Sequence, residues 1–139
     1  MNIRLETTDS GISWTEVASL FQVVKWGQRD PNDLRSAFGK STFKCFAFDD
    51  ETLVGFGRTI DDGKYMATVV DMIVHPDYHG RGIGRQIMHN LQSRLKGFLY
   101  VTLTAAAEVQ PFYTRLGWRK MTTGMILPRD EEQARRNCE

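Results

Sequence analysis

Three glycines stand on alternate positions in the segment HPDYHGRGIGRQ, residues 75–86. Gly80, Gly82 and Gly84 remove side chains from a short stretch of backbone, and Arg81 places a cation between the first two. Backbone amides without neighbouring Cβ atoms at the start of a helix form an anion site, because unpaired N–H groups and the helix dipole both favour negative charge. The segment therefore predicts a loop for a ligand with several phosphates, with Arg81 as its mobile cation.

Two well-known phosphate loops do not match this segment. The dinucleotide-binding pattern G-x-G-x-x-G fails because Arg85 stands where its last glycine would be. The nucleotide-triphosphate loop needs a Lys-Ser or Lys-Thr pair after its last glycine, and none closes this turn. From spacing alone, plain turn geometry stays open as the alternative to phosphate binding.

A longer stretch, VVDMIVHPDYHGRGIGRQIMHNLQ, resembles the acetyl-coenzyme A signature of the GNAT acyltransferase superfamily. That signature, Gln/Arg-x-x-Gly-x-Gly/Ala, opens the helix after the central strand. His79, Gly82 and Gly84 take its three fixed places, and His79 departs from the usual Gln or Arg. A second signature resembles FYTRLGW, residues 112–118, where Phe-Tyr-x-x-x-Gly-Phe is typical. Within the superfamily the chain is loosely similar to small aralkylamine (serotonin-type) N-acetyltransferases.

The resemblance implies a mixed α/β (α+β) GNAT acyl-CoA N-acyltransferase fold in a single domain over residues 1–139. We expect a mostly antiparallel central sheet of six or seven strands, with a splayed parallel pair and about four flanking helices. The implied activity is transfer of the acetyl group of acetyl-CoA to a primary amine by direct attack in a ternary complex. Acetylation of a protein or peptide amine, and a non-catalytic coenzyme A-binding sensor, are the alternatives.

The same resemblance implies where the coenzyme binds. In the family the pantetheine arm lies along the central strand, where one backbone amide polarises the thioester carbonyl, and the diphosphate lies on the amides of the glycine loop. The residues expected to contact the coenzyme are Met72, Ile73, Val74, His79, Gly80, Arg81, Gly82, Ile83, Gly84, Arg85 and Phe112.

Tyr113 is the expected general acid. A phenol with a pKa near 10 is protonated at neutral pH and can donate a proton to the leaving thiolate. Without the family pattern, a Tyr on an apolar helix stripe is more often a core residue.

Asp71 is the first candidate to feed a base or water relay that deprotonates the amine, because a carboxylate inside a β run is costly to bury unless paired or facing a wet cleft. Strand alternation would place Asp71 on the face of Val69 and Ile73. Glu108 is the second candidate, with a first-turn carboxylate that favours the helix dipole as the alternative. His75 is the third.

Substrate contacts are expected from the first two helices and the sheet. Trp26 and Phe38 are candidates for a lid, and Arg58 and Tyr65 for the sheet side of the acceptor site. Aromatic residues there would suit an apolar or aryl amine.

These residues need elements that position them. Ser13, with Glu16 three residues on, predicts a helix cap, and Asp30 followed by Pro31 predicts a second. The expected elements are a strand at 3–6, helices at 14–27 and 31–39, three antiparallel strands between 43 and 75, a helix to Gly97, a strand at 98–103, a helix at 108–117, a last strand at 118–127 and a mixed-charge tail that could hold a frayed helix.

Composition narrows the partners. A formal net charge of +1 gives no overall field for nucleic acid or an anionic membrane, so the expected partner is a small-molecule amine. Two cysteines and three histidines show no ligand spacing, so no metal site is expected. The cysteine usage and the lack of a signal-like or spanning segment predict a cytoplasmic protein. The family often pairs, so a homodimer is possible.

Overall fold

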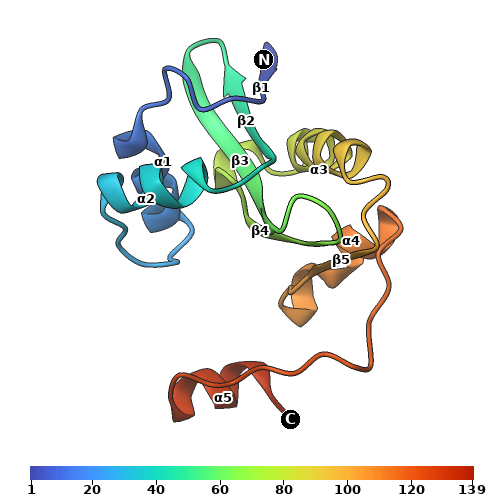
Figure 1. Ribbon diagram of the computed structural model, residues 1–139. Coiled ribbons are helices and arrows are strands. Elements are labelled where there is room, and N and C mark those ends of the chain that lie inside the picture. Colours follow the sequence, from blue (N-terminus) through green and yellow to red (C-terminus); the bar gives the residue numbers. More distant parts are fainter. The chain divides into compact units, whose positions relative to one another are not determined.

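The computed structural model describes all residues, 1–139, and the chain forms two compact units, Met1–Leu103 and Thr104–Glu139. The first unit holds a sheet with three helices, and the second holds short helices only (Figure 1). None of the helices is long and apolar enough to cross a membrane.

The sheet has five strands in the order β1-β2-β3-β4-β5. Neighbours among the first four are antiparallel, and β4 and β5 are parallel, which confirms the predicted mixed sheet. The expected count of six or seven strands is wrong. The strands are β1 (Ile3–Glu6), β2 (Lys44–Asp49), β3 (Thr52–Asp61), β4 (Met66–Val74) and β5 (Tyr100–Leu103).

The expected last strand, 118–127, does not form. These residues have no regular secondary structure, and Met125 and Leu127 are almost fully exposed. Their apolar residues do not alternate with polar ones at a period of two, so no single face of a strand would be buried. The second unit instead holds a 3-10 turn η2 (Ala107–Val109), α4 (Gln110–Arg115) and α5 (Glu131–Asn137).

The two predicted caps begin α1 (Trp14–Val23) and α2 (Pro31–Gly39). The Ser13 hydroxyl accepts the N–H of Glu16 over 3.3 Å, and the Asp30 carboxylate accepts from two amides of the first turn of α2. Helix α1 ends four residues before the expected Gly27, because Lys25 adopts a left-handed φ of 63°. The helices α1 and α2 cover one face of the sheet, and α3 (Ile83–Arg94) covers the other (Figure 1).

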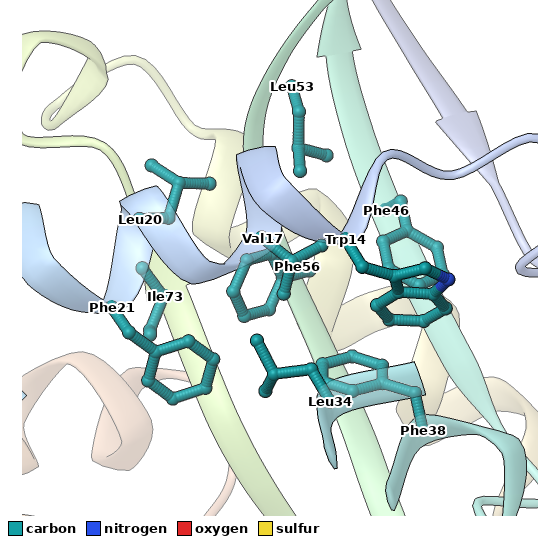
Figure 2. Close-up of a cluster of buried hydrophobic side chains, with 10 residues drawn as sticks. All are labelled: Trp14, Val17, Leu20, Phe21, Leu34, Phe38, Phe46, Leu53, Phe56 and Ile73. Carbon is teal, nitrogen blue, oxygen red and sulfur yellow. The ribbon is translucent and has the colours of Figure 1, made fainter. Parts of the chain in front are cut away.

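Aromatic side chains fill the layer between α1, α2 and the sheet (Figure 2). Phe38 lies at its centre, with its ring centroid 5.3 Å from Trp14, 5.7 Å from Phe46 and 5.6 Å from Phe56. Phe38 is fully buried, so its expected place in a substrate lid is wrong. The spacing of α2 makes Leu34 and Phe38 its buried stripe, and that stripe faces the sheet.

We expect Phe38→Ala to lower the free energy of unfolding by about 3–5 kcal/mol, because it leaves a cavity in a close-packed aromatic layer. Urea unfolding at neutral pH measures the change. Trp26→Ala is the matched control, since Trp26 is 48% exposed and its loss should cost far less. Equal, small losses for both variants would contradict the core role of Phe38.

Candidate active site

A bulge in β4 is the first unusual feature of the site. Arg58 of β3 pairs with Val70, and Phe56 pairs with Ile73, so two residues of β4, Asp71 and Met72, oppose one residue of β3. Asp71 takes a left-handed φ of 54°, which is uncommon for a residue other than glycine. The extra residue therefore shifts the alternation of β4 from this point on.

The bulge makes half of the predicted alternation wrong: Asp71 still lies with Ile73, because its partner Arg58 lies over Phe38, but Val69 does not share that face. Val69 pairs with Thr59 and Ile73 pairs with Phe56, and paired residues share a face. Because residues 59 and 56 of β3 differ in parity, Val69 and Ile73 lie on opposite faces rather than together. Ile73 joins the aromatic layer under α1 and α2 (Figure 2).

An ion pair fixes the Asp71 carboxylate. Asp71 Oδ2 accepts from Arg58 Nε over 2.8 Å, and Arg58 Nη1 donates to Ser41 Oγ over 3.2 Å. The guanidinium carbon lies 5.1 Å from the centroid of the Phe38 ring. The side chains of Arg58 and Asp71 are only 14% and 22% exposed, so solvent screens the pair weakly. The residue expected to feed the base relay is thus paired.

The far half of β4 has an edge that β5 does not cover. The parallel pairing ends at Val69 and Leu103, five residues before β4 ends. His75 N–H donates to Val54 O across to β3 over 2.8 Å, and backbone groups alternate along a strand. Ile73 therefore also turns its backbone groups toward β3, whereas Val74 turns its groups outward. The Met72 C=O also points outward, because it belongs to the same trans peptide as the inward Ile73 N–H.

This alternation reduces the set of β4 residues whose backbone could bind the coenzyme. Of the three expected residues, Met72 and Val74 present backbone groups at the uncovered edge, and Ile73 does not. The carbonyl oxygen of Val74 already lies 2.8 Å from His79 Nε2, which leaves the Val74 N–H and the carbonyl group of Met72 at this edge. His79 thus ties the glycine loop to the end of β4 in this chain.

The glycine loop follows the 3-10 turn η1 (Pro76–Tyr78) and enters α3. Gly80 and Gly82 have φ values of 77° and 81°, and Gly82 caps α3 without a side-chain hydrogen bond. The first turn of a helix has no intrahelical acceptor for its amides, so the N–H groups of Ile83, Gly84 and Arg85 remain available. A Cβ atom on Gly80 or Gly82 would have no other atom within 4 Å. The open amides fit a phosphate group.

The second unit carries three of the predicted residues, Glu108, Phe112 and Tyr113. Tyr113 and Phe112 lie on α4, and their ring centroids are 4.9 Å apart at a steep angle. Burial raises the pKa of Tyr113 above its ordinary value, because the anionic phenolate would lose water. Glu108 lies exposed in the 3-10 turn η2, where it stands in the first turn as its alternative interpretation predicts.

A surface pocket of about 480 Å³ lies between α2 and the end of β3. Asp33, Lys40, Arg58 and Asp61 give its lining two carboxylates and two cations, and no aromatic residue lines it. Burial disfavours the charge on Asp61, but hydrogen bonds led by that from Thr59 outweigh burial and hold the pKa of Asp61 below its usual range.

The substrate residues expected from the sequence are scattered. Arg58 lines this pocket, whereas Trp26 and Tyr65 do not and are about half exposed elsewhere on the first unit. Sequence reasoning missed Ser41, a buried residue two positions after the end of α2 whose hydroxyl holds Arg58. No local pattern could reveal it, because its partner is 17 residues away.

Cys45 has no place in the chemistry. It is fully buried in β2, and burial raises the pKa of its thiol to about 11. A neutral, inaccessible thiol is not a nucleophile at physiological pH. His75 is also engaged, since its Nδ1 accepts the N–H of Asp77 over 3.1 Å.

The glycine loop opens a helix beside the edge of β4 that β5 leaves uncovered, as the resemblance to the GNAT signature predicts. The family model described as "Acetyltransferase (GNAT) domain" matches residues 12–125, across both units. The chain belongs to the GNAT acetyltransferase family.

Relatives agree with this GNAT assignment. The chain is 31% identical over 134 residues to the "Uncharacterized N-acetyltransferase ycf52" of Porphyra purpurea, covering 88% of this chain and 77% of the relative. It is 30% identical over 125 residues to the same-named protein of Pyropia yezoensis, covering 86% and 72%. The solved GNAT acetyltransferase SP0256 of Streptococcus pneumoniae TIGR4 matches with a TM-score of 0.77 at 25% identity, covering 92% and 99%.

Arg58 and Asp71 should behave as an energetically coupled pair. We expect Arg58→Met to lower the free energy of unfolding by about 1–3 kcal/mol, because a weakly solvated carboxylate loses its partner. Asp71→Gly removes that carboxylate and suits the left-handed φ, so the double variant should regain part of the loss. A urea-unfolding double-mutant cycle measures the coupling, and strictly additive losses would show that the bulge does not depend on the pair.

Proposed function

We propose that this GNAT protein transfers the acetyl group of acetyl-CoA to a primary amine by direct attack. The observation that carries the proposal is the open set of amides at the start of α3, next to the edge of β4 that β5 leaves uncovered. The amides would bind the phosphates of the coenzyme, and the uncovered edge of β4 would bind its pantetheine arm. The family match supports acetyl transfer in general.

The binding residues are the amides from Arg81 to Arg85 for the diphosphate and the outward backbone groups of Met72 and Val74 for the pantetheine arm. When bound, acetyl-CoA supplies an activated acetyl thioester. An N–H of the β4 edge donates to the carbonyl oxygen of that group, where negative charge develops as the amine attacks. The glycines at 80 and 82 keep side chains away from the phosphates.

Tyr113 Oη holds a proton at neutral pH, and we assign it the donation of this proton to the sulfur that leaves. The raised pKa of Tyr113 supports the role, because the phenol stays protonated over the pH range in which amines are acetylated.

The acceptor amine arrives protonated and must first lose a proton. Asp71 and Glu108 are the carboxylates proposed to feed a base or a water relay. The ion pair of Asp71 with Arg58 favours an indirect part for Asp71, in which it orients a water molecule. Glu108 is exposed and can exchange protons with solvent.

The pocket between α2 and β3 is the proposed approach for the acceptor. Its carboxylates can bind an ammonium group, and its polar lining favours a polar amine over the aryl amine expected from the sequence. Aralkylamines are still among the acceptors to be tested. A peptide amine, and a coenzyme A sensor without turnover, are the competing functions.

The proposal also includes the location and the oligomeric state of the protein. A cytoplasmic location and a homodimer are expectations from cysteine usage and from family habit. Light scattering on the purified chain measures the oligomeric state directly.

Tyr113→Phe should lower the rate of acetyl transfer by about 10²-fold or more while leaving coenzyme affinity within about twofold, because the phenyl ring keeps its packing but has no proton to give. Thiol release from acetyl-CoA is followed with aryl amines, polyamines, amino acids and lysine peptides. Since burial raises the pKa of Tyr113, the wild-type rate should fall only above pH 10, when the proton is lost. Equal rates for both proteins would remove Tyr113 from the chemistry, and a wild type that binds coenzyme but never releases thiol would favour the sensor.

Gly82→Ala should weaken coenzyme A binding by about tenfold or more, because a methyl group enters the open space over the amides and strains a left-handed backbone. Calorimetric titration measures the affinity. Gly97→Ala is the matched control: Gly97 has a φ of 100°, has no atom near its Cβ position, and lies beyond the other end of α3. If both variants bind as the wild type does, the diphosphate does not lie on this loop.

A further inference from the structure

Tyr78 links the sheet to the glycine loop. Its hydroxyl donates to Oδ2 of Asp49, the last residue of β2, over 2.8 Å. The other oxygen of Asp49 accepts the backbone N–H of Asn2 over 2.9 Å. These bonds, the one from Asn2 first and then the one from Tyr78, favour the ionised carboxylate and lower the pKa of Asp49, while the shared hydrogen bond raises the pKa of Tyr78. The phenol end of the Tyr78 side chain is therefore fixed to the sheet.

The ring of Tyr78 also contacts His75. The His75 ring meets it nearly perpendicularly, with centroids 6.2 Å apart. The Arg81 guanidinium lies over the Tyr78 ring, with its central carbon 5.3 Å from the ring centroid. Nη1 of Arg81 also lies 3.7 Å from Met1 Sδ. An exposed arginine, which would otherwise sample many rotamers, thus has a defined place beside the loop.

The second arginine of the loop does not share this arrangement. Arg85 Nε lies 3.4 Å from His89 Nε2, one turn farther along α3. The Arg85 side chain therefore runs along the helix surface. Arg81, between the two left-handed glycines, is the cation that the structure holds at the loop itself.

We propose that Tyr78, anchored by Asp49, is a positioning residue that keeps the Arg81 guanidinium at the glycine loop for the diphosphate of the coenzyme. The inference rests on the proposed function, because it assumes that the loop binds that diphosphate. Tyr78 acts on binding through Arg81 and makes no chemical step of its own. Holding the cation in place before the ligand arrives reduces the ordering that binding requires.

The test is a double-mutant cycle in coenzyme A affinity, measured by calorimetry with Tyr78→Leu, Arg81→Gln and the double variant. Tyr78→Leu should weaken binding by about two- to fivefold, the size of an exposed cation–π contact. Arg81→Gln should weaken it by about tenfold through loss of a charged phosphate contact. The double variant should bind no more weakly than Arg81→Gln. Additive losses, or a Tyr78→Leu variant that binds as well as or better than the wild type, would overturn the inference.

Two further measurements separate positioning from a general structural defect. Pantetheine, which lacks the diphosphate, should compete equally well for the wild type and for Tyr78→Leu, and an equal loss for both ligands would contradict the inference. Tyr100→Leu, an exposed tyrosine at the start of β5, is the matched control and should leave coenzyme affinity unchanged.

Tyr78→Phe keeps the ring and removes its bond to Asp49, so it repeats the cycle if Tyr78→Leu fails to fold. A smaller loss that disappears in the Arg81→Gln background supports the inference, and a loss that persists there overturns it. A wild type that binds no coenzyme A would remove the proposed function itself, whereas a wild type that binds with an additive cycle removes only the role of Tyr78.

Discussion

The ion pair between Arg58 and Asp71 holds β4 in a conformation that an uninterrupted strand would not adopt. A left-handed aspartate costs on the order of 1 kcal/mol, and the charged hydrogen bond to Arg58 is of a size that can offset it. The bulge then decides which backbone groups of β4 face β3 and which face the uncovered edge. Because Met72 and Val74 fall on the outward side, the proposed binding of pantetheine depends on this single extra residue.

Close packing on the opposite face fixes the glycine loop. A Cβ atom on Gly57 would lie 3.1 Å from Leu91 and 3.2 Å from the sulfur of Met72, and one on Gly55 would lie 2.9 Å from the carbonyl oxygen of Ile73. Without side chains at these two positions, α3 lies close against β3. The contact between the helix and the sheet therefore fixes where α3 begins. As a result, the amides of the glycine loop have a fixed position relative to the end of β4.

Local signals in the sequence predicted the local structure well. Ser13, Asp30 and Pro31 begin helices where expected, and the glycine loop leads from β4 into α3. These features depend on a few neighbouring residues, so one chain is enough to recognise them. The bulge depends on Arg58, 13 residues from Asp71, and strand alternation puts Val69 on the wrong face once one residue is inserted.

The wrong predictions for Phe38 and for residues 118–127 have the same cause, which is dependence on contacts with distant elements. Phe38 is expected in a lid because aromatic residues on the first two helices would suit an aryl amine, but its burial is decided by Trp14, Phe46 and Phe56 on other elements. The expected strand at 118–127 had β-prone residues but needed a partner strand and a buried face, and the chain provides neither in this structure.

The proposed chemistry divides between the two units of the chain. The amides, the β4 edge and the Arg58–Asp71 pair all belong to Met1–Leu103, whereas Tyr113 and Glu108 belong to Thr104–Glu139. In this proposal the diphosphate and the pantetheine arm contact backbone groups of the first unit, whereas the proton donor, with the expected coenzyme contact Phe112, lies in the second. A change in Tyr113 that altered coenzyme affinity as strongly as a change in Gly82 would not fit this division, because the phosphate amides are held by the packing of α3 on β3, to which Tyr113 does not belong.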